Sequence, residues 1–166
     1  MAKRTELSPA VLFLAAAILI PAGWVMGSFP LFIFLGFAPL FALTDRTQDS
    51  SSVWEKMEWI LLALCISFIA AVSFDFTRIV SSLLFAILFT LSFLGHVWVR
   101  RTLGLRVGKI TIVLFWLAAE YIILKTIAAK SIFLADAVRL QPDWMRWNIH
   151  TGFLGASLWI LLVNLA

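Results

Sequence analysis

The chain has 166 residues, of which 63% are hydrophobic and 13% charged, and its formal net charge is +4. So little polar sequence cannot cover a water-soluble domain of this length, and a disordered chain would be far more polar, so both classes are excluded. We predict a single transmembrane domain over 1–166, an all-α polytopic helical bundle. Its basic balance is typical of loops that touch anionic membrane lipid, and we expect no nucleic acid partner.

The first two predicted spans are short, and each contains an internal proline. Span one covers about Pro9 to Met26, and Pro21 within it predicts a kink because proline lacks the amide hydrogen of the helical ladder. Span two covers about Leu31 to Leu43 and is interrupted by Pro39. A polar, serine-rich surface loop is expected from Thr44 to Lys56.

Two longer spans follow, joined by a tight connection. Span three covers about Met57 to Phe74, and span four covers about Ile79 to Val99. Asp75 and Arg78 lie three residues apart between them, so they form an outer-edge pair if the turn is helical. His96 lies near the inner end of span four. A single histidine there is a candidate ligand for a haem or pigment, although a packing histidine is the more common case.

The connection after span four carries the strongest topological signal. It contains Arg100, Arg101, Arg106 and Lys109, and dense basic residues in a short loop mark the cytoplasmic side of a membrane. We therefore predict that these four side chains contact lipid headgroups. With six spans, the same rule also places the N-terminus in the cytoplasm.

Span five, about Ile110 to Ala129, carries Glu120 near its middle. A carboxyl group at that depth costs about 2.5–3.5 kcal/mol on insertion scales, so it should be buried against a protein partner. Asn164 in span six, about Gly152 to Ala166, reaches a similar depth, which predicts a hydrogen bond to Glu120. Ser157 shares a helical stripe with Asn164.

The intramembrane polar residues Glu120, Asn164 and Ser157 have two interpretations that the sequence leaves open. They form either a buried polar clamp between spans five and six, or a polar feature of a lipid-headgroup or substrate cavity. Cys65 lies within an apolar run, with no second soft ligand near it, so no metal site is predicted. Between spans five and six, the segment from Lys130 to His150 is expected to begin as a helix lying in the membrane interface.

Three stretches stand out in order along the chain. They are Phe29 to Leu40 with two prolines, Phe115 to Tyr121 with Trp-x-x-x-Glu, and Trp144 to Asn164 with Thr-Gly-x-x-Gly-x-Ser. In order and spacing they resemble the membrane region of the apolipoprotein N-acyltransferases. That family transfers an acyl chain from a phospholipid to the N-terminal cysteine of bacterial lipoproteins. The resemblance implies a multi-pass protein of the bacterial inner membrane.

The sequence also departs from that family. The family's catalytic Glu, Lys and Cys belong to a nitrilase-like domain outside the membrane, and no part of this chain resembles that domain. Cys65 lies inside a span, so no catalytic residue is assigned. The basic residue common three positions after the family's glutamate is Ile123 here, and Asp75-Phe76 replaces an aromatic pair.

We therefore expect a non-catalytic membrane protein that binds lipid or lipoprotein, or serves as an accessory subunit of a larger membrane assembly. One alternative is a fragment or partner subunit of a lipoprotein N-acyltransferase, so the question of enzymatic activity stays open. Another is a small pigment- or haem-binding subunit, with His96 as the ligand. Membrane lipids and other membrane protein subunits are the expected partners.

Overall fold

The computed structural model describes residues 7–26, 30–45, 53–72, 76–126, 133–146 and 148–166, and within them every regular element is helical. The all-α prediction is thus confirmed. The elements, in chain order, are α1 (Pro9–Val25), η1 (Pro30–Phe32), α2 (Ile33–Gly36), α3 (Ala38–Asp45), α4 (Val53–Ala71), α5 (Phe76–Leu103), α6 (Leu105–Thr126), η3 (Leu134–Val138), η4 (Pro142–Met145), α7 (Asn148–Thr151) and α8 (Phe153–Leu165).

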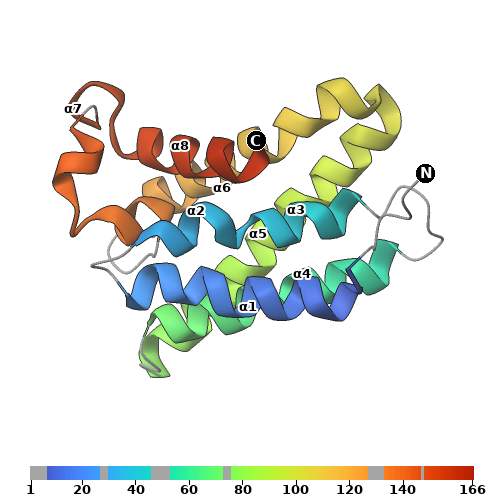
Figure 1. Ribbon diagram of the computed structural model, residues 1–166, viewed down its shortest axis with the longest axis horizontal. Coiled ribbons are helices and arrows are strands. Elements are labelled where there is room, and N and C mark those ends of the chain that lie inside the picture. Colours follow the sequence, from blue (N-terminus) through green and yellow to red (C-terminus); the bar gives the residue numbers. More distant parts are fainter. Residues whose placement is uncertain (1–6, 27–29, 46–52, 73–75, 127–132, 147) are drawn as a thin grey trace.

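The long helices run back and forth along the longest axis of the molecule (Figure 1). The start of α1, the end of α3, the start of α4 and the turn between α5 and α6 lie at one end, on the right of the view. We call this the α5–α6 end. The end of α1, η3 and α7 lie at the opposite end, which we call the α7 end. Helix α8 packs against α6 and α2, and α1 packs against α4.

One helix among the described residues, Arg78–Leu103, is long and apolar enough by itself to cross a membrane. The segments Pro9–Val25, Pro30–Asp45 and Phe153–Leu165 are also apolar but shorter. Helix α5 extends past the predicted end of span four at Val99, so that Arg100 belongs to the helix and not to a loop. The prediction of six membrane crossings goes beyond these findings and remains a prediction.

The two prolines have different local outcomes. Helix α1 continues through Pro21 as one element. The segment Pro30–Asp45 instead breaks at Phe37, between α2 and α3, two residues before Pro39. A proline ring clashes with the carbonyl four residues earlier and supplies no amide hydrogen, so the ladder cannot continue regularly past Pro39.

The segment Pro30–Asp45 lies very close to α1, because both contribute a buried glycine to the contact. A Cβ atom built on Gly23 would lie 2.7 Å from Ile33 Cβ and 2.8 Å from the Ile33 amide nitrogen. A Cβ atom on Gly36 would lie 2.9 Å from Ile20 Cγ1. The two glycines therefore permit a backbone approach that any side chain would block.

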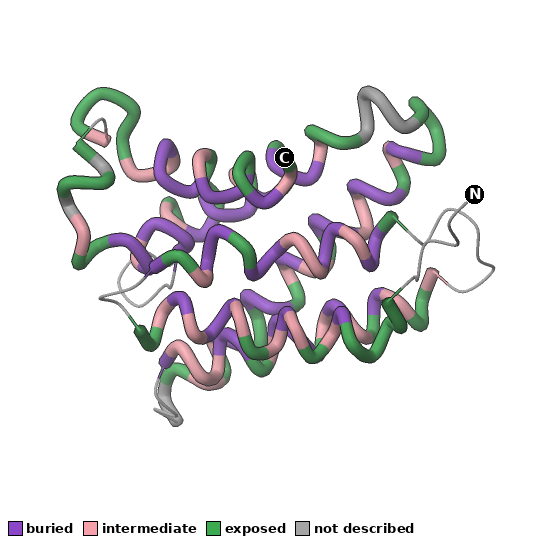
Figure 2. The backbone as a smooth tube through the Cα atoms, viewed as in Figure 1, coloured by how far each residue is buried: buried purple, intermediate pink, exposed green. Residues whose placement is uncertain are grey.

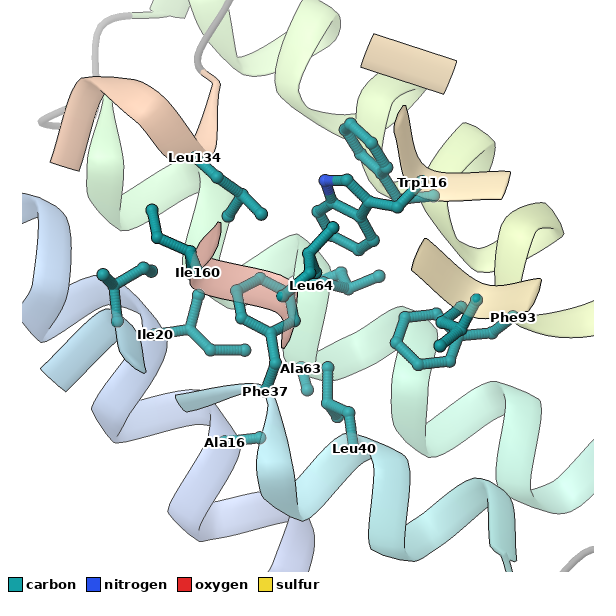
Figure 3. Packing of buried hydrophobic residues seen from close by; sticks show 14 of the residues in the cluster. Ala16, Ile20, Phe37, Leu40, Ala63, Leu64, Phe93, Trp116, Leu134 and Ile160 are labelled. Carbon is teal, nitrogen blue, oxygen red and sulfur yellow. The ribbon is translucent and has the colours of Figure 1, made fainter. Parts of the chain in front are cut away.

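Aromatic rings from several helices meet at the centre of the bundle. Trp116 of α6 is fully buried and stacks on Phe89 of α5 with ring centroids 4.0 Å apart. Phe37, at the break between α2 and α3, contacts Trp116 edge-on with centroids 4.9 Å apart. Leu134 and Ile160 also contribute to this core (Figure 3). The segment Pro30–Asp45 and η3 are thereby fixed against α6.

The outward faces of the helices are apolar as well. Figure 2 shows exposed residues recurring along the helices, between buried ones. Within the most apolar stretch of Arg78–Leu103, only 39% of the residues are buried. Exposed large hydrophobic side chains include Leu14, Ile18, Leu62, Ile66, Val80, Leu84, Ile87, Leu91, Leu114, Ile122, Leu158, Leu162 and Val163.

Candidate functional site

Glu120 is buried, as the sequence predicts, but it lies off the centre of its helix. Its side chain has no solvent exposure. Helix α6 ends at Thr126, about 9 Å beyond Glu120 at 1.5 Å per residue, and begins at Leu105. Within the described part of α6 the carboxyl group therefore lies toward the α7 end, and the predicted end of the span at Ala129 lies outside the described residues.

The partner of Glu120 is the beginning of η3. Glu120 Oε1 accepts hydrogen bonds from the Leu134 amide at 3.0 Å and from Trp116 Nε1 at 3.3 Å. One residue earlier, the Phe133 amide donates to Asp136 Oδ2 at 3.0 Å. The first amides of a helix have no partner within the helix, so two carboxyl groups satisfy donors that would otherwise be unpaired. Burial raises the pKa of Asp136, and the hydrogen bond from Phe133 opposes that shift.

In the described part of the segment after Lys130 the predicted helix is the short 3-10 helix η3, and its position in the membrane interface stays a prediction. Phe133 and Leu134 are buried within the bundle, and so are Ala135, Ala137 and Val138. Trp24 Nε1 of α1 donates to the Phe133 carbonyl at 3.2 Å. The apolar residues that suggested contact with lipid instead contact protein, and the carboxyl group of Glu120 compensates the buried backbone.

The predicted hydrogen bond between Glu120 and Asn164 is wrong, because Asn164 is fully occupied elsewhere. Its Oδ1 accepts from the amides of Phe37 at 2.9 Å and Ala38 at 3.1 Å. Its Nδ2 donates to the carbonyls of Ile33 at 2.9 Å and Ile160 at 2.8 Å. The side-chain amide thus bridges the Ile33 carbonyl and the Phe37 amide, which would bond each other in an unbroken helix.

Ser157 of α8 is fully buried and approaches the Glu120 carboxyl. Its Oγ and Glu120 Oε2 nevertheless make no hydrogen bond of acceptable geometry in the described structure. The structure therefore brings together Glu120 and Ser157 but not Asn164. A buried oxygen without a partner costs about 1–3 kcal/mol, so this pair is a local weak point.

A cavity of about 190 Å³ lies at the α5–α6 end. Arg100 of α5, only 4% exposed, lines it and pairs through Nη1 with Asp45 of α3. His96 lines it too, with its Nδ1 2.9 Å from Thr111 Oγ1 of α6. Lys109 is exposed and completes the basic lining.

The basic residues predicted to contact lipid headgroups differ in their exposure. Arg100 is not on an outward-facing loop, since its side chain is buried in α5 and pairs with Asp45, and its contact with a lipid headgroup stays a prediction. Arg101 and Lys109 are exposed. Asp75 and the side chain of Arg106 lie outside the described residues, so the pairing of Asp75 with the exposed Arg78 stays a prediction. Among the described residues, no three His, Cys, Asp or Glu side chains are grouped to hold a metal.

A second hollow, of about 480 Å³, lies at the α7 end, and the sequence did not predict it. Its lining combines charged groups with apolar ones. The residues are Ala135, Asp136, Val138, Arg139, Asp143, Arg146, Asn148, Ile149 and Phe153. Arg146 Nη2 pairs with Asp143 Oδ1 at 2.9 Å. The mixture of acidic, basic and apolar residues that follows Phe133 in the sequence could have indicated this hollow.

Comparison of the chain with protein-family models, with curated proteins and with solved structures finds no match.

Proposed function

We propose that this chain is a non-catalytic membrane domain of the apolipoprotein N-acyltransferase type, which holds a lipid or a lipidated polypeptide at the hollow of the α7 end. In this proposal it crosses the bacterial inner membrane six times, with the α5–α6 end in the cytoplasm. The hollow supports the function most directly, because it offers charged and apolar lining at one place. Any acyl transfer would need a catalytic domain on another polypeptide or segment.

The apolar outer surface supports the membrane part of the proposal. A core helix of a water-soluble protein is mostly buried, whereas only 39% of the apolar stretch in α5 is buried. Similar exposed leucines and isoleucines lie on α1, α4, α6 and α8. Exposed large apolar side chains in this number are unfavourable in water and favourable against lipid chains. Re-entrant backbone such as η3 is tolerated at membrane depth when protein buries it.

The hollow suits an amphipathic ligand that has charges of both signs. Arg139 and Arg146 provide cations, and Asp136 and Asp143 provide anions. Ile149 and Phe153 add apolar surface beside them. A glycerophospholipid headgroup or the N-terminus of a lipoprotein combines the same features. The sequence resemblance and the chemistry of the hollow thus support the same class of ligand.

The proposed orientation predicts the labelling of two single cysteines. In a chain with Cys65→Ala, we expect Leu140→Cys to react with a membrane-impermeant maleimide on intact spheroplasts. Thr102→Cys should react only after the membrane is permeabilised. Both positions are exposed on the molecule, so a difference in reaction reports the side of the membrane. Reaction of Thr102→Cys before permeabilisation would reject the orientation, and equal reaction of both would reject the bilayer crossing.

Ligand binding at the hollow is tested by mass spectrometry of the detergent-extracted protein. We expect phospholipid or lipopeptide to co-purify with the wild type, and Ile149→Lys to reduce its amount about tenfold by adding a charge to the apolar part of the hollow. Leu140→Lys is the matched control, since Leu140 is exposed nearby and does not line the hollow. Equal retention by the Ile149 variant and the wild type would contradict the proposed site.

A further inference from the structure

We propose that the cavity at the α5–α6 end is a binding site for a single phosphate group. Its polar lining includes Thr44, Asp45, His96, Arg100 and Lys109. This cavity lies at the opposite end of the bundle from the hollow of the α7 end, and none of its lining residues belongs to that hollow. The inference is therefore independent of the proposed function.

Arg100 supplies the central donor. Its guanidinium is buried, yet Nε has no hydrogen-bond partner in the described structure, while Nη1 pairs with Asp45. A buried charged donor without an acceptor is costly, so an acceptor placed in the cavity would stabilise it. The planar guanidinium presents several donors in a fixed geometry, which suits the oxygens of a phosphate better than a single acceptor atom.

The charges around the cavity favour an anion. Arg100 and Lys109 contribute two positive charges and Asp45 one negative charge, which leaves +1 with His96 neutral. Asp45 pairs with Arg100, so the excess positive charge is that of Lys109, whose side chain is exposed as Asp45 is. The cavity thus retains an uncompensated positive charge next to an unpaired donor.

The size of the cavity limits what enters it. A volume of about 190 Å³ is below the ~300–1,000 Å³ typical of sites for whole small molecules. The phosphate alone would be enclosed, and whatever carries it would stay outside. Leu165 of α8 and Ile112 of α6 line the cavity. The exposed apolar side chains of Leu162, Val163 and Leu114 lie within three residues of them in the sequence, which offers a surface for acyl chains. An anionic phospholipid is therefore the favoured carrier over free phosphate.

Thermal unfolding of the purified full-length chain in detergent tests this inference. We expect dihexanoyl phosphatidic acid to raise Tm saturably, and dihexanoylglycerol, which lacks the phosphate, to leave it unchanged. Arg100→Lys keeps the charge opposite Asp45 but removes Nε, and should weaken the apparent Kd about tenfold or more. Lys109→Gln should weaken it similarly, without disturbing a buried pair.

Arg101→Gln is the matched control, because it removes the same charge from an exposed neighbour that does not line the cavity. It should change the apparent Kd less than twofold. If inorganic phosphate binds as tightly as the phosphatidic acid, the phosphate site stands and the lipid carrier is rejected. Three results would overturn the site. The first is the absence of a saturable Tm shift with both phosphatidic acid and inorganic phosphate, and the second is an equal Tm shift with hexanoate. The third is an equal weakening of the apparent Kd in Arg101→Gln and Lys109→Gln.

Discussion

Asn164→Leu is expected to lower the free energy of unfolding by about 3–5 kcal/mol. Leucine is similar in size but offers no hydrogen bond, so the amides of Phe37 and Ala38 and the carbonyl of Ile33 lose their partner. Each buried backbone group left unpaired costs about 1–3 kcal/mol. Asn164 is only 7% exposed, although it and Ala38 line the cavity of the α5–α6 end, so a water molecule from that cavity could replace only part of these hydrogen bonds and the lower end of the range allows for it.

The measurement is unfolding of the purified protein by heat or by titration with a denaturing detergent, followed by circular dichroism. Asn148→Leu is the matched control, since Asn148 Oδ1 is buried without a hydrogen bond and its loss should cost little. Equal midpoints for Asn164→Leu and the wild type would show that the break between α2 and α3 needs no support from α8.

Glu120→Leu is expected to lower the free energy of unfolding by about 2–4 kcal/mol, whereas Glu120→Gln should leave it close to wild type. Leucine leaves the Leu134 amide and Trp116 Nε1 without an acceptor. Glutamine keeps an oxygen for both donors, and its amide can donate to Ser157 Oγ, which has no partner now. The contrast separates the need for an acceptor from the need for a charge.

The damage from Glu120→Leu should be local to η3 before it becomes global. With Cys65→Ala as background, Ala135→Cys introduces a thiol at a buried position of η3. We expect that thiol to react slowly with a small maleimide when Glu120 is intact and much faster when Glu120→Leu is added. Glu58→Leu removes an exposed carboxylate from α4 and serves as control. Unchanged thiol reactivity on adding Glu120→Leu would refute the role of Glu120 in holding η3.

The sequence predicts the helices well, because long apolar runs bounded by polar turns leave few alternatives. It also predicts that Glu120 is buried, since the cost of exposing a carboxyl group to lipid forces that outcome. It did not identify the partner. The depth of Glu120 along its helix restricts its possible hydrogen-bond partners to residues at the same level of the bundle. A search among side chains alone leaves out the backbone amides at that level. The amides of Phe37 and Leu134 have no partner within their own helices, and they donate to Asn164 and Glu120 respectively.

Two signals in the sequence would have improved these predictions. Pro39 breaks a helical ladder, which implies that a buried polar side chain from another span must bond the freed backbone groups. Arg100 was assigned to a loop from its charge. The spacing of Phe89, Phe93, His96 and Arg100 places all four on one helical face, and all four are buried. Helical periodicity was therefore a better guide to Arg100 than charge density.

The bridge made by Asn164 has a consequence for biogenesis. The ribosome releases α2 and α3 long before α8, because 127 residues separate Phe37 from the side chain that accepts its amide. If the chain crosses a membrane as proposed, the nascent break between α2 and α3 must keep its amides in water, in the insertion machinery or on a provisional acceptor during that interval, since lipid offers none. In the proposed membrane protein, stable integration of α2 and α3 should therefore wait for the synthesis of α8, despite their separation along the chain.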